Sequence, residues 1–157
     1  MKTIAHMAVP LFLLISSLSP AAEAPKSQEK LETTASHIVR GKVIEVTSKV
    51  EKSKIKTYHD TDRDTIYTIT VQVEKVSKGD EAKQGEQIAV LAWTPHTREP
   101  NGYIVESMKQ TPIYLPGRQG QDLIPKKGDN ATFYLTGGGK EPFELLTPNG
   151  VAVDKAK

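Results

Sequence analysis

The sequence contains no cysteine, and this absence excludes several classes of function at once. A chain without thiols forms no disulfide, offers no thiolate ligand to a metal and has no cysteine nucleophile. It also has no residue to carry a lipoprotein anchor. Small exported domains commonly depend on disulfides, so any domain formed by this chain must be stabilised by its hydrophobic core alone.

The sequence also lacks a strong excess of charge of either sign. Its 157 residues include 21 Lys and Arg against 19 Asp and Glu, so the formal net charge is only +2. Lysine and glutamate are interspersed and no basic face is visible, so we do not expect nucleic acid as a partner. The length corresponds to one small globular domain.

No apolar run is long enough to cross a bilayer. The longest, Met7 to Leu18, follows Lys2 and precedes a stretch of small residues, which is the layout of a secretory signal peptide. We expect residues 1–21 to be this signal peptide, with cleavage after Ala21 or after Ala24, and an uncleaved N-terminal anchor is the alternative. The mature protein is then exported, periplasmic or secreted, without stable membrane insertion.

What the sequence does contain is a clear strand pattern between Thr65 and Gly79. From residue 67 to residue 73 polar and apolar residues alternate strictly, and β-branched and aromatic residues dominate. The apolar residues of one side are Tyr67, Ile69, Val71 and Val73. This period of two predicts a long strand with one buried face.

Two further strands flank this one. In residues 36–47 the apolar face changes near Val43 and Ile44, which predicts a bulge or a sharp bend. Gly41 in the same strand is predicted to let another backbone approach closely. Residues 87–93 carry apolar side chains on both faces, which is typical of a central strand.

The end of the domain is predicted to be a hairpin. Its strands are residues 131–136 and 142–147, joined by a glycine-rich loop. The first of them buries either Phe133 with Leu135 or, on its opposite face, Tyr134 with Thr132.

A long irregular stretch, residues 94–129, separates the third strand from the hairpin and is interrupted by prolines and glycines. Loops of this length in compact domains are usually functional or ordered by their own packing. Residues 22–34 are polar apart from Leu31, so we expect a flexible segment with one helical turn near residues 28–31. The sequence therefore predicts an all-β domain over residues 35–154, a small five- to six-stranded OB-like barrel with a long irregular insertion at 94–129.

Several segments together resemble the OB-like barrel of the netrin-like family, which includes the tissue inhibitors of metalloproteinases and is represented among uncharacterised exported bacterial proteins. The matching segments are residues 35–43, 67–79, 87–92 and 128–146, with a closing Phe143 to Gly150. The resemblance implies the fold. It transfers no inhibitory mechanism, because the family's inhibitors bind the catalytic zinc of the protease through a disulfide-linked N-terminal cysteine and this chain has none.

Candidate binding residues gather at the end of the third strand and in the insertion. OB folds use aromatic and basic side chains to stack against sugars or oligonucleotides. The residues of this kind are Trp93, His96, Arg98, Tyr103, Tyr114 and Arg118. For Trp93 a position in the core is the alternative. We expect a non-enzymatic binding domain whose partner is an extracytoplasmic protein or carbohydrate.

One acidic run has the spacing of a calcium loop. Asp60, Asp62 and Asp64 alternate as in an EF-hand, but the positions that an EF-hand fills with glycine and glutamate hold Thr65 and Val71. A solvated hairpin tip is the alternative. Weakly bound calcium is therefore the one cofactor that the sequence leaves open.

No catalytic motif is complete. The chain lacks H-E-x-x-H, a G-x-S-x-G nucleophile elbow and a P-loop, so we expect no enzymatic activity. Two alternatives to the binding domain stay open. One is an extracellular protease inhibitor of the netrin-like type that acts by loop insertion. The other is a metal-binding protein or enzyme that uses His59, His96 and the run from Asp60 to Asp64.

Overall fold

The computed structural model describes residues 24–53, 62–98, 103–104 and 120–154, so the predicted signal peptide lies outside the described residues. Within these ranges the chain forms one helix and seven strands. In chain order they are α1 (Gln28–Thr34), β1 (His37–Lys52), β2 (Arg63–Lys78), β3 (Gln87–Arg98), β4 (Tyr103–Ile104), β5 (Asn130–Gly138), β6 (Glu141–Leu145) and β7 (Val151–Val153). No helix of the described residues has the length and hydrophobicity that crossing a membrane requires.

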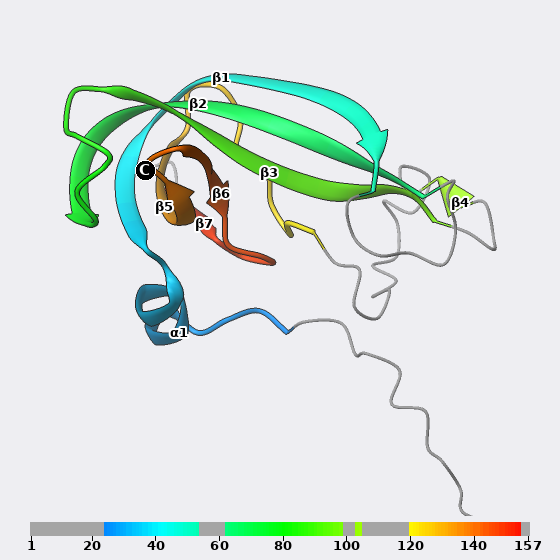
Figure 1. Ribbon diagram of the computed structural model, residues 1–157, viewed down its shortest axis with the longest axis horizontal. Helices are drawn as coiled ribbons and strands as arrows, with labels where there is room; N and C mark the ends of the chain where they lie inside the picture. Colours follow the sequence, from blue (N-terminus) through cyan, green and yellow to red (C-terminus); the bar gives the residue numbers. More distant parts are fainter. Residues whose placement is uncertain (1–23, 54–61, 99–102, 105–119, 155–157) are drawn as a thin grey trace, which may run out of the picture.

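Five of the strands close into a barrel (Figure 1). Their order around the wall is β1, β2, β3, β6 and β5, and β5 returns to pair with β1. The β3–β6 pair is parallel and the other pairs are antiparallel. β7 adds to β5 and β4 adds to the end of β3. The predicted all-β, OB-like barrel is thereby confirmed.

Strand β1 closes the barrel because it changes partners along its length. It pairs with β2 throughout, but with β5 only as far as Lys42. Its register against β2 slips at Ile44, where β1 carries one residue more than its partner. Because side chains alternate along a strand, the extra residue moves the inward face from Val43 to Val46. The bulge predicted at this point is confirmed.

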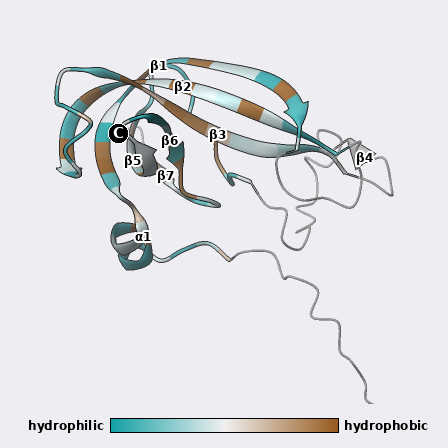
Figure 2. Cartoon of the chain, viewed as in Figure 1, coloured by the Kyte–Doolittle hydropathy of each residue, from teal (hydrophilic) through white to brown (hydrophobic). Residues whose placement is uncertain are grey.

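The main core fills the inside of the barrel. Ile69, Val71 and Val73 of β2 are fully buried there, and Tyr67 packs against the cluster half-buried, as the alternation predicts. Figure 2 shows the result as hydrophobic bands that alternate with hydrophilic ones along the strands. Phe133 of β5 is the largest side chain that is completely buried.

A smaller core lies outside the barrel, under α1. The helix begins after Ser27, whose hydroxyl accepts a hydrogen bond from the Lys30 N–H at 3.2 Å. It continues to Thr34, three residues beyond the single turn that was expected near residues 28–31. Leu31, the one buried residue of the helix, packs on Tyr134 of β5.

Strand β5 is therefore buried on both faces. Phe133 and Leu135 point into the barrel, while Tyr134 points outward and is covered by α1. The sequence offered these two faces as alternatives. Both are buried, because the helix supplies a second apolar surface that strand periodicity alone does not reveal.

The covered tyrosine predicts a fall in stability at high pH. Burial raises the pKa of Tyr134 above its ordinary value of 10.0, and the negative charge of Glu32 on α1 raises it further. The folded protein then keeps this proton at a pH at which the unfolded chain releases it. The stabilisation is complete below pH 10 and is lost as the pH rises through the folded-state pKa.

We accordingly expect the free energy of unfolding to fall between about pH 8 and about pH 11, and to fall less in Tyr134→Phe. Urea unfolding at the two pH values measures both slopes. Glu32→Gln should give an intermediate slope because it removes only the second cause. Equal slopes in the three proteins would show that Tyr134 is not responsible.

Candidate binding cleft

The outer surface of the barrel carries a cleft of about 310 Å³. This volume lies at the lower end of the range that binds small ligands or single side chains. The described residues that line it come from β2, β3, β5, β6 and the segment after β6. They are Asp64, Ile66, Leu91, Ala92, Trp93, Thr136, Glu144, Leu145, Leu146 and Thr147.

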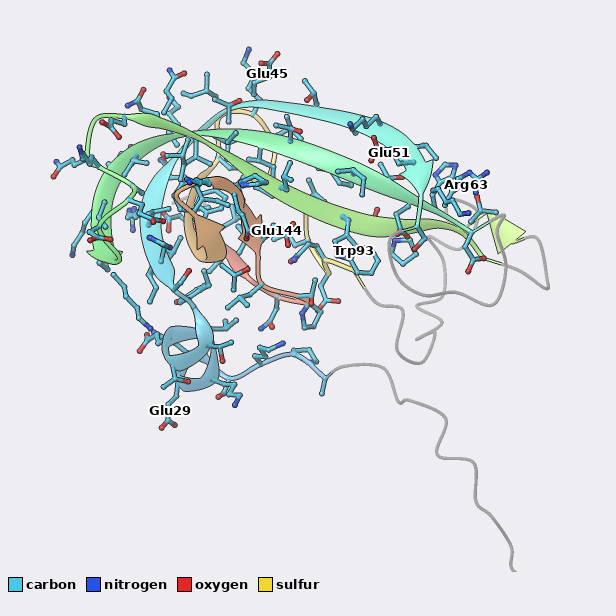
Figure 3. The ribbon with its side chains drawn as sticks, in the orientation of Figure 1. Glu29, Glu45, Glu51, Arg63, Trp93 and Glu144 are labelled. Atoms are coloured by element: carbon cyan, nitrogen blue, oxygen red, sulfur yellow. The ribbon has the colours of Figure 1, made fainter. Side chains whose placement is uncertain are left out.

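Strand pairing sets the floor of the cleft. Ile66 of β2 lies opposite Trp93 of β3, and Leu91 of β3 lies opposite Glu144 of β6. Since residues two apart in a strand face the same side, Leu91 and Trp93 share the outward face of β3. Figure 3 shows the side chains of Trp93 and Glu144 along one side of β3. An aromatic ring and two aliphatic side chains thus lie next to an acidic one.

The charge of the lining residues is negative. Asp64 is only 3% exposed, whereas the Glu144 side chain is open to solvent. No lining residue within the described ranges carries a positive charge. A cation is present at the rim, where the Lys26 ammonium donates a hydrogen bond to the carbonyl of Thr147. This distribution favours neutral or cationic ligands over anionic ones.

Gln121 does not line the cleft but connects two of the segments that do. Its backbone N–H donates to the Trp93 carbonyl at 2.8 Å, and its side-chain amide donates to the carbonyls of Leu145 and Leu146 at 3.1 and 3.0 Å. Gly120 allows this approach, because a Cβ there would overlap the Trp93 backbone. The last part of the predicted insertion therefore ties β3 to the chain after β6, and the cleft is preformed.

Strand β3 is longer than predicted and is less covered. It does not end at Trp93 but continues through Pro95 to Arg98, so residues 94–98 of the predicted insertion belong to the barrel wall. Pro95 is tolerated because the β2–β3 register shifts beside it, between Arg63 and Asp64. The outward face was expected to be covered, but Ala89 is exposed and Leu91 and Trp93 are half-buried.

The structure places only Trp93 of the predicted binding residues in the cleft. His96 lies further along β3, with Nδ1 3.2 Å from the Thr65 hydroxyl. Arg98 and Tyr103 pair through their backbones, but their side chains are not described. Tyr114 and Arg118 lie outside the described residues.

Eight of the ten lining residues were missed by the sequence reasoning, among them Ile66, Leu91 and Glu144. Ile66 and Leu91 had a local indication, since each is an apolar residue on the face opposite the main core. Glu144 had none. It lies in the cleft because β6 pairs in parallel with β3, and no local sequence pattern predicts this pairing.

Only part of the acidic run, from Asp62 to Asp64, lies within the described residues. Asp62 and Asp64 are 1% and 3% exposed, so this end of the run is not the solvated tip that was the alternative. Asp60 and His59 lie outside the described residues. Among the residues that are described, no group of three His, Asp or Glu is arranged to hold a metal ion. Calcium therefore stays a prediction.

A second polar cluster centres on His37, which is 5% exposed. Its Nδ1 lies 2.9 Å from the Ser36 hydroxyl, its Nε2 lies 3.3 Å from a Glu81 carboxylate oxygen, and its ring packs edge-on against Phe143. The Ser36 hydroxyl also lies within hydrogen-bonding distance of two β5 carbonyls. The cluster joins β1 to the β2–β3 loop and the β5–β6 hairpin, so its contacts tie the end of the barrel together.

The chain matches no protein-family model and has no significant similarity to a curated protein or to a solved structure. The class of protein is therefore defined by geometry: an all-β, OB-like barrel with a preformed cleft on its outer face. The netrin-like resemblance stays a prediction from the sequence.

Proposed function

We propose that the protein is a non-enzymatic binding domain that holds an extracytoplasmic ligand, a protein segment or a carbohydrate, in the cleft over β3 and β6. The observation that carries this proposal is the position of the cleft. It opens on the face formed by β2 and β3, which is the face through which OB folds bind their ligands. The signal peptide predicted for residues 1–21 supports an extracytoplasmic ligand.

The composition of the cleft is also that of a binding site. Small-molecule and side-chain pockets combine an apolar lining with a few polar groups that fix orientation. Here Trp93, Leu91 and Ile66 supply the apolar surface, and Glu144 supplies an acceptor of hydrogen bonds. The hydrogen bonds from Gln121 to the carbonyls of Leu145 and Leu146 hold these two lining residues in place before a ligand arrives, which reduces the entropy that binding would cost.

The proposal moves the predicted site from the insertion to the barrel wall. The described end of the insertion, Gly120 and Gln121, does not line the cleft but is bonded to the backbone of Trp93, which does. The protease-inhibitor function and the metal function both depend on residues outside the described ranges, and no described contact favours them. Both therefore stay predictions.

Tryptophan fluorescence tests the proposal, because the chain contains a single tryptophan and it lines the cleft. We expect a saturable shift of Trp93 emission when a panel of peptides and neutral oligosaccharides is titrated into the full chain. A ligand that covers the half-buried indole removes water from it. For a hit, Trp93→Ala should weaken binding by about tenfold or more in calorimetry.

His96→Ala is the matched control, because His96 is on the same strand but not in the cleft lining. Its affinity should equal that of the unmodified chain. Binding that survives Trp93→Ala and is lost in His96→Ala would place the site at the far end of β3, outside the cleft, and contradict the proposal.

A further inference from the structure

We propose that the occupant of the cleft is a peptide segment that inserts a lysine or arginine side chain. This inference rests on the proposed function and names its ligand. It depends on two features of the described residues: an acidic group with no partner and an apolar surface beside it.

The acidic group is the Glu144 carboxylate. Within the described part of the chain it takes part in no ion pair and no side-chain hydrogen bond, although it is exposed at the cleft. Two other carboxylates are engaged in ion pairs: Asp154 pairs with Arg40, and Glu81 pairs with His37. Asp64 also lines the cleft but is buried, so the accessible carboxylate is that of Glu144. Low-dielectric walls concentrate the field of such a group, so the cleft attracts a cation.

The apolar surface selects the form of that cation. Leu91 and Ile66 lie beside Trp93 on the floor, next to Glu144. Lysine and arginine side chains pack their methylene stems on apolar surface and keep the charged head at a polar edge. The head would lie near the Glu144 carboxylate and the Trp93 ring, which attracts cations through its face.

The same floor disfavours a carbohydrate. A sugar ring can stack on Trp93, but its hydroxyl groups would then face Leu91 and Ile66 and lose hydrogen bonds to water without replacement. Phosphate-bearing ligands are disfavoured by the Glu144 carboxylate.

The rim of the cleft already holds one cation of the chain itself. The Lys26 ammonium donates a hydrogen bond to the carbonyl of Thr147, which is one of the lining residues. The Lys26 backbone is held in place by two hydrogen bonds of 2.9 Å with the Asn149 side chain. The Thr147 carbonyl is therefore already occupied by an ammonium group, and an incoming basic head is directed to the Glu144 carboxylate instead.

The test uses two pools of short peptides with blocked ends. One pool carries a fixed central arginine or lysine, and the matched pool carries citrulline or acetyl-lysine, which keep the stem and remove the charge. We expect the basic pool to shift Trp93 emission at concentrations about fivefold to tenfold lower than the neutral pool. Raising the salt concentration should reduce this difference.

Glu144→Gln should weaken binding of the basic pool by about fivefold to tenfold and leave the neutral pool unchanged. Glu141→Gln is the matched control, since Glu141 is exposed on the same strand and does not line the cleft. It should bind both pools like the unmodified chain.

The outcomes separate the two proposals. Equal binding of both pools, or an unchanged affinity in Glu144→Gln, overturns the basic occupant. A saturable response to neutral oligosaccharides but not to peptides also overturns it, while the proposed binding function stands. No saturable response to any member of the panel contradicts both.

Discussion

Replacing Phe133 with alanine is expected to lower the free energy of unfolding by about 3–5 kcal/mol, the largest effect that we expect of any single substitution in this chain. Phe133 is completely buried in the barrel, and its strand pairs with Val39 of β1 on one side and Val151 of β7 on the other. Strands held by hydrogen bonds on both edges cannot move in to fill the space, so a cavity remains.

This loss is a large fraction of the free energy of unfolding of the whole domain. Domains of this size have a free energy of unfolding of about 5–15 kcal/mol, and this chain has no disulfide to offset a weakened core. Urea unfolding followed by far-ultraviolet circular dichroism measures the change. Phe133→Leu keeps most of the volume and should cost less than about 1.5 kcal/mol. A loss below about 1 kcal/mol in Phe133→Ala would mean that the site relaxes and that the barrel is not closed around this residue.

The strands were predictable because a period of two is a local property. Ile69, Val71 and Val73 were assigned to one buried face from alternation alone, and they are the centre of the core. The bulge at Ile44 was predictable for the same reason, since a change of apolar face within one strand indicates a bulge or a sharp bend at that point.

The cleft was not predictable in this way, because it depends on pairing between distant segments. Leu91 and Glu144 are neighbours only because β3 and β6 pair in parallel. No local pattern around either residue predicts this pair. The packing of helix α1 was not predictable for the same reason. Leu31 is a single apolar residue in a polar segment, and its burial follows from the outward position of Tyr134 on a strand far along the chain.

Trp93 illustrates why the chemistry of a residue is harder to predict than its strand. A binding role and a core position were alternatives, yet the half-buried side chain lines the cleft while its strand neighbours Val90 and Ala92 are in the core. A strand with apolar residues on both faces indicates that both are partly covered. It does not indicate which face another chain segment leaves open.

Gly41→Ala should reduce the free energy of unfolding by about 3 kcal/mol, the upper end of the usual cost of overpacking. The sequence predicted a close approach of backbones here, and a Cβ at this position would overlap the Gln72 carbonyl oxygen and the Val71 side chain. The obstacle is the backbone of β2, and on its other side β1 pairs with β5 through Ala131, so neither neighbouring strand can move aside without breaking hydrogen bonds of the sheet.

Gly85→Ala is the control: Gly85 has open space around its Cβ position but a φ of +85°, so this variant should lose only about 1 kcal/mol, from backbone strain. Gly41 is not among the glycines with positive φ, so a larger loss in Gly41→Ala, measured by urea unfolding, can only come from crowding between strands. Equal losses in the two variants would contradict the close approach of β1 and β2 at the point where the barrel closes.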